Sequence, residues 1–321
     1  MGCVLHESQT AYHHVNVSIV KGPRLTLIVH GHTTIRVPWL HTFRFAIEES
    51  ISKMPGPMLD VSPSPPNVVY WDDFQDLFAE SHRQGEHVAI VGPNGSGKTM
   101  MGLELCKIIG ARRQRVNGRP SPVCVLQYKP RDDTLRMVLP EESWPVIKKW
   151  PPKYGEEHCI VWPRGGPPST AASRQRAVFA PLLDKIYVEG GQTVYIPEAA
   201  YFERAQPAGL SLSGTMEQFW STARSNKLTV ISDTQRPRKV TLLMWTEPAW
   251  VIIYQLDHRD DVKHVADLVG TDFGTTIWTY LPRLGTHECL VIRRQRHPKV
   301  REVYVTRVTG VTGNNSNGRG R

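Results

Sequence analysis

The feature that most constrains this chain is a glycine-rich octapeptide, Gly92-Pro93-Asn94-Gly95-Ser96-Gly97-Lys98-Thr99. An apolar run at residues 87–91 precedes it, and a helical stretch at residues 100–109 follows it. A strand, a loop with the spacing G-x-x-x-x-G-K-T and a helix form, in this order, a cradle of backbone N–H groups for phosphate. The sequence therefore predicts a site for a nucleoside triphosphate with Mg²⁺.

The chemistry of phosphate binding explains the residue types. Glycines let the backbone curl so that successive N–H groups face the β-phosphate, and the following helix points its positive end at the same anion. Lys98 reaches the β- and γ-phosphates, and Thr99 offers a hydroxyl to Mg²⁺. A turn without a ligand would not need Lys-Thr at the helix start. The expected nucleotide contacts are Gly92, Pro93, Asn94, Gly95, Ser96, Gly97, Lys98, Thr99 and Met100.

The charge of the chain is unevenly distributed. In total, 39 Lys and Arg and 30 Asp and Glu residues give a formal net charge of +9. Residues 1–86 contain 6 of the basic and 9 of the acidic residues, so residues 87–321 contain 33 and 21 and carry +12. A basic excess on the part that holds the glycine loop favours a nucleic-acid partner over a charge that serves solubility alone.

Cysteine usage and hydropathy indicate a cytoplasmic protein. No apolar run approaches the roughly 20 residues of a membrane span, and polar residues from His6 onward interrupt any signal-peptide core. The cysteines show no C-x-x-C spacing, which is typical of reduced, mostly buried thiols. The five cysteines are Cys3, Cys106, Cys124, Cys159 and Cys289.

A proline-rich stretch at residues 54–67 predicts a stiff linker and a domain boundary. Before it, alternating apolar residues at 12–37 predict strands, and the apolar spacing at 40–54 is that of one helix face. We expect four parts: an N-terminal α+β module at 1–60, the linker and a capping helix at 61–85, the core at 86–309, and a disordered basic tail at 310–321.

From residue 87 onward, short apolar runs alternate with helical stretches. This alternation, with several unbroken apolar strands, predicts an α/β fold with a mostly parallel sheet covered by helices on both faces. Strands are expected at residues 87–91, 122–127, 160–162, 193–196, 228–231, 250–254, 288–292 and 303–308. Helices are expected at residues 71–83, 100–109, 171–188, 215–224 and 260–269.

The strand expected at 193–196 ends in Pro197-Glu198. Many ATPases with this glycine loop have Asp-Glu here, in which the Asp orients a Mg²⁺-bound water and the Glu polarises the attacking water. Proline is tolerated at a strand end, and Glu198 keeps the carboxylate that can accept a proton from water. We predict that Glu198 is the general base; the alternative is an acid of a surface loop.

Pro197 has no side-chain oxygen, so the metal must depend on other groups. Thr99 supplies a hydroxyl, and phosphates and solvent can supply further oxygens. A nearby acid can replace the missing one: Asp233, at the exit of the neighbouring strand, is the first candidate, and Asp132 is the second. Thr99 and Asp233 are therefore the predicted Mg²⁺ ligands.

A third group of residues lies around the strand at 228–231. Ala223-Arg224-Ser225 precedes this strand, and Asp233-Thr234-Gln235-Arg236-Pro237 follows it. With the glycine loop before them and Asp257-His258-Arg259-Asp260-Asp261 after them, these residues make the chain resemble the FtsK–HerA superfamily of DNA-pumping ATPases. The resemblance spans roughly residues 86–308 and does not cover residues 1–70.

The resemblance implies a RecA-like fold, a hexameric ring and ATP-driven movement of DNA. Within it Lys98 and Thr99 hold the nucleotide and Mg²⁺, Glu198 is the base, and Gln235 senses the γ-phosphate. It makes Arg224 a candidate to act on the nucleotide of an adjacent subunit, where an arginine neutralises charge on the transferred phosphoryl group. The alternative for Arg224 is a cation at the negative end of a helix dipole.

Two functions from different classes remain. The first is an ATPase that is stimulated by DNA and moves DNA in packaging, transfer or segregation. The alternative, which Pro197 favours, is a non-motor, nucleotide-gated binding or assembly protein with slow or absent hydrolysis. An ABC-type ATPase is disfavoured, because Leu212-Ser213-Gly214-Thr215 only approximates the required signature and follows Glu198 rather than preceding it.

Overall fold

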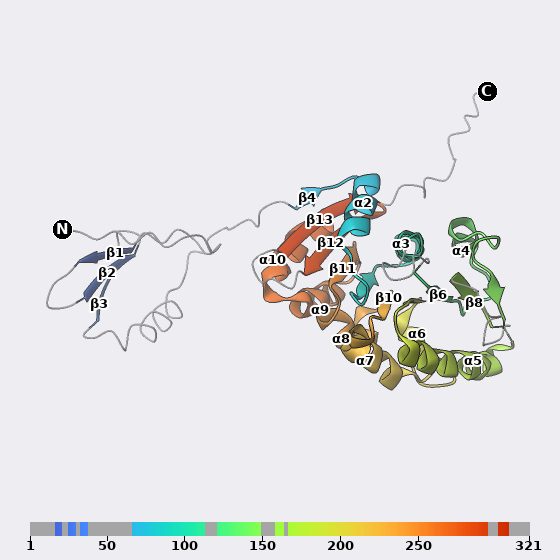
Figure 1. Cartoon of the computed structure of the whole chain (residues 1–321). Helices are drawn as coiled ribbons and strands as arrows, with labels where there is room; N and C mark the ends of the chain where they lie inside the picture. Colours follow the sequence, from blue (N-terminus) through green and yellow to red (C-terminus); the bar gives the residue numbers. More distant parts are fainter. Residues whose placement is uncertain are drawn as a thin grey trace, which may run out of the picture. The chain divides into compact units, whose positions relative to one another are not determined.

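The computed structural model describes residues 17–20, 25–29, 33–37, 66–112, 121–148, 158–163, 166–294 and 301–307. The chain divides into two units, Met1–Val61 and Ser62–Arg321 (Figure 1). None of the described helices combines the length and the apolar character that crossing a bilayer requires.

The first unit contains an antiparallel sheet in the order β1-β2-β3. Its strands are β1 (Val17–Val20), β2 (Leu25–Val29) and β3 (Thr33–Val37). They confirm, within the described residues, the β-structure expected in this part of the chain. The helix expected at 40–54, the linker up to residue 65 and the tail expected at 310–321 lie outside the described residues.

The second unit is built on a ten-stranded sheet in the order β4-β13-β12-β11-β5-β10-β9-β6-β8-β7. Every neighbouring pair in the run β11-β5-β10-β9-β6-β8-β7 is parallel. The pairs β11–β12 and β12–β13 are antiparallel. The strands are β4 (Asn67–Val68), β5 (Val88–Val91), β6 (Val123–Leu126), β7 (Val146–Ile147), β8 (His158–Val161), β9 (Thr193–Ile196), β10 (Thr229–Thr234), β11 (Trp250–Tyr254), β12 (Glu288–Arg294) and β13 (Arg301–Arg307).

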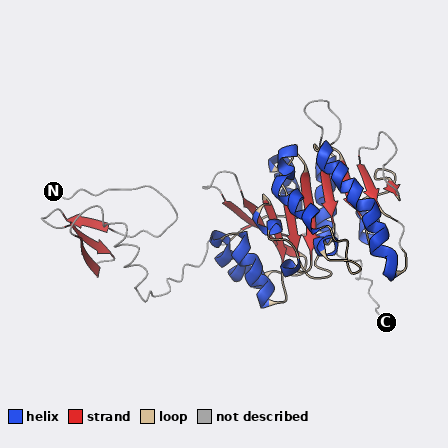
Figure 2. Ribbon diagram, turned by 90° about the horizontal axis from the view of Figure 1, so that it is seen from below, coloured by secondary structure: helices blue, strands red, loops and turns tan. Residues whose placement is uncertain are grey.

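Helices cover the sheet along both of its faces (Figures 1 and 2). They are α2 (Trp71–Ser81), α3 (Lys98–Gly110), α4 (Asp133–Val138), α5 (Pro168–Glu189), α6 (Ala199–Glu203), α7 (Ser213–Thr222), α8 (Leu243–Thr246), α9 (Arg259–Val269) and α10 (Thr271–Tyr280). Short 3₁₀ helices lie between some of the helices and strands: η2 (Ala223–Asn226) between α7 and β10, η3 (Pro237–Lys239) between β10 and α8, and η4 (Leu281–Arg283) between α10 and β12.

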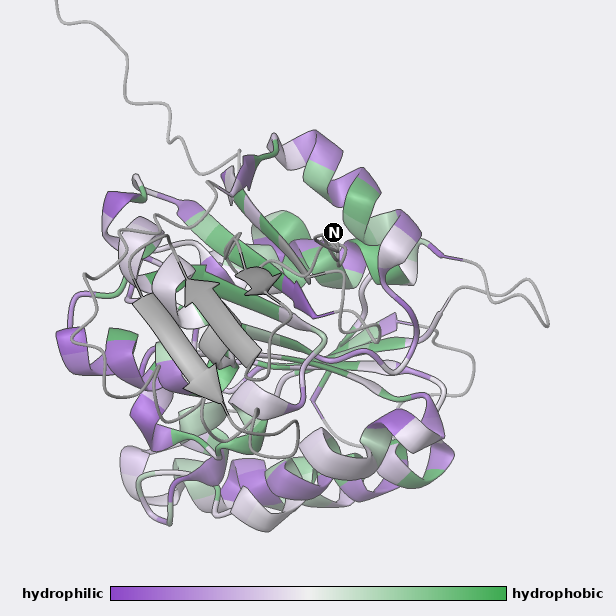
Figure 3. Cartoon of the chain, turned by 90° about the vertical axis from the view of Figure 1, so that its left-hand side faces the viewer, coloured by the Kyte–Doolittle hydropathy of each residue, from purple (hydrophilic) through white to green (hydrophobic). Residues whose placement is uncertain are grey.

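The strand β5 shows why the sheet needs two covered faces. All four of its residues are buried, and successive side chains of a strand point to opposite faces. Val88 and Ile90 belong to the core that includes α2 and α3, whereas Ala89 and Val91 belong to the core that includes α5, α7 and α9. In Figure 3 the strands of this sheet are mostly hydrophobic, and the helices around them carry many hydrophilic residues.

The expected α/β fold with a mostly parallel sheet is confirmed, and each strand and helix expected from residue 71 onward is present within a few residues of its expected bounds. The structure adds short elements that the pattern did not predict, among them β4, β7, α4, α6 and α8, and the longer α10. It also shows that β12 and β13 extend the sheet in antiparallel orientation.

Candidate functional site

The carboxyl ends of β5, β10 and β9 meet at one edge of the sheet. Ser232 of β10 pairs with Ala89 of β5 on one side and with Ile196 of β9 on the other. Because these three strands are parallel, the segments that follow them emerge together: the glycine loop after β5, Pro197-Glu198 after β9 and Gln235 after β10. The glycine loop lies about a hundred residues or more before the other two segments in sequence, and the parallel strands bring all three together in one site.

The glycine loop, residues 92–97, needs glycine for its backbone conformation at two positions and for lack of space at a third. Gly95 and Gly97 have φ angles of +76° and +103°, a conformation that glycine adopts readily. A Cβ atom on Gly92 would lie 2.5 Å from the Ser96 Oγ and 2.8 Å from the Cβ of Tyr254. The buried Ser96 Oγ has no hydrogen-bond partner among the described residues. A tight loop with an unsatisfied polar atom fits the phosphate groups of a nucleotide.

Lys98 is the first residue of α3 and its side chain is buried. Its Nζ donates to the Pro93 carbonyl oxygen at 3.1 Å, so the ammonium lies over its own loop. Burial lowers the pKa of Lys98, and the nearby Asp233 and Glu198 carboxylates raise it. One turn later, a Cβ on Gly102 would approach the ring of Tyr195 to 2.6 Å, so this glycine lets α3 pack closely against β9.

Glu198 follows β9 in a left-handed backbone conformation, with φ of +50°. Residues other than glycine keep this conformation where the surroundings hold it, and such positions cluster at functional sites. Its carboxylate accepts hydrogen bonds from the Thr234 hydroxyl at 3.1 Å and from the Gln235 N–H at 3.2 Å. Burial, followed by the Asp233 charge, raises the pKa of Glu198, which brings the carboxyl closer to the range useful for a general base.

Asp233 lies buried in β10 beside Glu198. Its carboxylate accepts hydrogen bonds from the Tyr195 hydroxyl and from the Glu198 N–H, the latter at 3.3 Å. Burial raises the pKa of Asp233, and the Lys98 ammonium lowers it. The structure therefore brings Lys98, Glu198 and Asp233 together. Tyr195 was not expected in the site, because in the sequence it is indistinguishable from an apolar strand residue.

Hydroxyl and carboxylate oxygens are ligands of the kind that Mg²⁺ prefers, and this ion usually also binds phosphate oxygens and water. Thr99, half-buried beside Lys98, and Asp233 therefore fit the predicted Mg²⁺ site. Among the described residues no group of three or more His, Cys, Asp or Glu side chains could hold a metal by itself. Asp132, the second candidate, accepts hydrogen bonds from the Leu135 N–H at 3.0 Å and from the Gln127 amide at 2.9 Å, and its role as a metal ligand stays a prediction.

Arg224 does not join this group. It is exposed in η2, and a Cβ on Gly85 would lie 3.2 Å from its carbonyl oxygen. The proximity of Arg224 also contributes, after burial, to lowering the pKa of His87 to about 4. Gly85 and His87 precede β5, whereas the glycine loop follows it, so Arg224 lies at the opposite end of the sheet from the loop of its own chain.

The topology and the loop together define the class of the protein. The strand β10 lies between β5, which carries the glycine loop, and β9, which carries Glu198. The second unit is an α/β, RecA-like P-loop NTPase core, as the resemblance implied.

No family model and no curated protein matches the chain. Among solved structures it is similar to the DNA-packaging ATPase B204 of Sulfolobus turreted icosahedral virus, with 11% identity, a TM-score of 0.48, and coverage of 69% of this chain and 98% of that chain. It is similar to the cytoplasmic domain of the type VII secretion ATPase EccC of Thermomonospora curvata, with 12% identity, a TM-score of 0.45, and coverage of 73% and 27%. For a KaiC-like protein of Pyrococcus horikoshii the identity is 14%, the TM-score 0.36, and the coverage 69% and 89%.

Proposed function

We propose that this protein is an ATP-hydrolysing motor that moves DNA. One observation carries the proposal: a single segment, residues 234–239, contacts the Glu198 carboxylate at its beginning and lines a cationic cavity at its end. Such a segment can connect the state of the nucleotide site to the binding of a polyanion. The proposed process is packaging, transfer or segregation, and the proposed nucleotide is ATP with Mg²⁺.

Each residue of the nucleotide site has a proposed task. Lys98 leaves the Pro93 carbonyl and neutralises charge on the β- and γ-phosphates. Glu198 accepts a proton from the attacking water, and Gln235, whose N–H orients that carboxylate, senses the γ-phosphate. Mg²⁺, held by Thr99 and Asp233, would supply further positive charge to the phosphate oxygens.

The cationic cavity has a volume of about 550 Å³ and opens between η3 and the start of α9. Its lining residues are Arg236, Arg238, Lys239, His258, Arg259, Asp260 and Asp261. Arg238 pairs with the exposed Asp260 at 3.4 Å, and such exposed pairs are weak. The lining has four Arg or Lys side chains and two Asp side chains, so its net charge is positive. This charge suits contacts to nucleic-acid phosphates.

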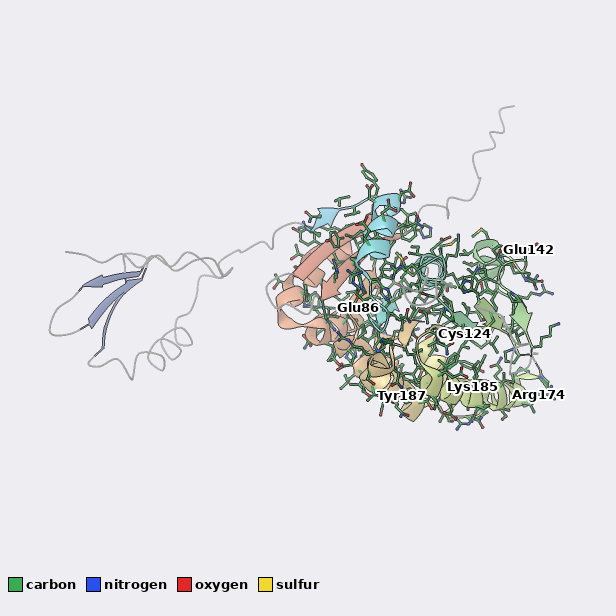
Figure 4. The ribbon with its side chains drawn as sticks, viewed as in Figure 1. Glu86, Cys124, Glu142, Arg174, Lys185 and Tyr187 are labelled. Atoms are coloured by element: carbon green, nitrogen blue, oxygen red, sulfur yellow. The ribbon has the colours of Figure 1, made fainter. Side chains whose placement is uncertain are left out.

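The cavity leads to a prediction about salt dependence. Replacing two exposed cations in it, Lys239→Gln with Arg259→Gln, is expected to weaken duplex binding and to flatten the slope of log affinity against log salt by about 0.9 for each phosphate that the variant no longer neutralises. Fluorescence anisotropy across a salt series measures this slope. The matched control is Lys107→Gln with Lys185→Gln, two exposed lysines on α3 and α5 that pair with neighbouring acids. Figure 4 labels Lys185 on α5.

The control variant, Lys107→Gln with Lys185→Gln, should bind DNA like the parent. An equal slope in the cavity variant and the control would place the DNA contacts elsewhere. If the parent binds no DNA at low salt, or hydrolyses no ATP with or without DNA, the motor proposal is wrong and the non-motor, nucleotide-gated alternative replaces it.

We also propose a hexameric ring in which Arg224 acts on the nucleotide of the adjacent subunit. Its exposed position at the far end of the sheet supports this, because it cannot serve its own glycine loop. Arg224→Ala is expected to lose activity, and mixing it with Glu198→Gln subunits should restore part of it at interfaces that keep both groups. Lys227→Ala, an exposed cation in the next turn, is the control. A fully active monomer would contradict the proposal.

A further inference from the structure

His287 lies in the turn between η4 and β12, with a φ angle of +64°. In this left-handed region a side chain is strained, although histidine tolerates it better than most residues. The turn is well defined around it: the Gly285 N–H donates to the Glu288 carboxylate at 2.7 Å, and the Glu288 N–H donates to the Gly285 carbonyl at 3.1 Å. A glycine would fit this backbone with less strain, so the imidazole needs another explanation.

The imidazole reaches the glycine loop, 191 positions away in the sequence. Its Nδ1 lies 3.2 Å from the carbonyl oxygen of Ser96. Because a carbonyl oxygen only accepts, Nδ1 carries the proton and donates. A Cβ on Gly97 would lie 3.5 Å from the same Nδ1 and 3.5 Å from the Tyr254 hydroxyl oxygen. His287 and Tyr254 therefore contact the loop from outside the octapeptide, at the residues directly before Lys98.

The geometry of the peptide group gives this contact a consequence. In a planar trans peptide the C=O and the N–H point in opposite directions. A hydrogen bond that holds the Ser96 C=O toward His287 therefore turns the N–H of Gly97 to the opposite side. The N–H groups of such a loop bind phosphate only when they converge, and groups that are already oriented before binding avoid the entropic cost of ordering them.

We propose that His287 is a positioning residue for the phosphate loop: it fixes the Ser96–Gly97 peptide in the orientation that phosphate binding requires. The inference rests on the proposed nucleotide site. In this proposal the strained backbone at His287 serves phosphate binding and does not stabilise the fold. Substitution of His287 should therefore lower the affinity for phosphate groups without lowering the Tm.

The test is His287→Gly, which removes the imidazole and relieves the backbone strain. Affinity for ADP and for pyrophosphate, measured by calorimetry, is expected to fall about 10-fold, the loss of one oriented hydrogen bond. The Tm without nucleotide is expected to stay equal or rise. His287→Asn keeps a donor and tolerates the left-handed backbone, so it should recover part of the affinity. Thr286→Gly adds the same flexibility to the turn, keeps the imidazole, and should bind like the parent.

A His287→Gly variant that binds ADP like the parent would overturn the proposal, and so would a fall in Tm that accompanies the lost affinity in both His287 variants. These results are distinguishable from failure of the nucleotide site itself. If His287→Gly binds ADP like the parent while Lys98→Ala does not bind it, the nucleotide site stands and only the role of His287 is wrong. If the parent binds neither ADP nor pyrophosphate, both proposals are wrong.

Discussion

The Lys98→Ala variant is expected to fold and to lose nucleotide binding, with ATP turnover falling to background. The ammonium is the cation that the glycine loop aims at the phosphates, and truncation leaves their charge under-neutralised. In the protein without nucleotide, the Lys98 ammonium donates a hydrogen bond to the Pro93 carbonyl oxygen. Its burial is unfavourable for the charged form and lowers its pKa. Its removal should therefore leave the fold intact.

Calorimetric titration with ADP and a steady-state ATPase assay measure the loss, and circular dichroism reports the fold. Lys107→Ala is the matched control, because this lysine is exposed on the same helix and pairs with Glu104. A Lys98→Ala variant that binds and hydrolyses ATP like the parent would show that the glycine loop is not the active site.

Glu198→Gln is expected to keep ATP bound and to slow hydrolysis by roughly 10²-fold or more, the scale of general-base catalysis. The amide has the shape of the carboxylate and can still accept a hydrogen bond from Thr234 or Gln235, but it cannot take a proton from water. Single-turnover hydrolysis and ATP titration separate the two effects. Unchanged turnover would falsify the assignment of Glu198 as the base.

The pH dependence of stability provides a control for this variant. Burial and Asp233 raise the pKa of Glu198 above its unfolded value. The contribution of this group to the free energy of unfolding is thus fully present below the unfolded pKa and is lost as the pH rises through the folded pKa. Glutamine does not titrate, so the Tm of Glu198→Gln at neutral pH should equal or exceed that of the parent. Slow turnover in a protein that is not destabilised then points to the chemistry.

Several features of the fold could be predicted because they depend on neighbours in sequence. The unbroken apolar runs of β5, β6 and β9 predicted buried parallel strands, and all of their residues are buried. The short helices α4 and α6 could not be predicted in the same way. They span six and five residues, too few to show a helical period, and short helices depend on tertiary packing for their stability.

The residues of the candidate site also fall into two groups: those that the sequence identified and those that only the structure brought to the site. The octapeptide identified Lys98 and Thr99, since spacing along the chain is enough to recognise a phosphate loop. Tyr195, Tyr254 and His287 carried no such signal. Each contacts the site from a strand or turn that is far away in sequence. The two tyrosines look like any other apolar strand residue, and His287 looks like an ordinary polar turn residue.

The sequence by itself determined where the phosphate loop lies, which segments become strands, and which carboxylate ends β9, because these properties follow from local spacing and periodicity. Only the tertiary structure decided which of these groups meet. The order β5-β10-β9 inserts a late strand between two earlier ones, and parallel register then sets Asp233 beside Glu198 and Lys98 while η2 carries Arg224 to the opposite end. Strand order arises from packing across the whole sheet, so no local pattern encodes it.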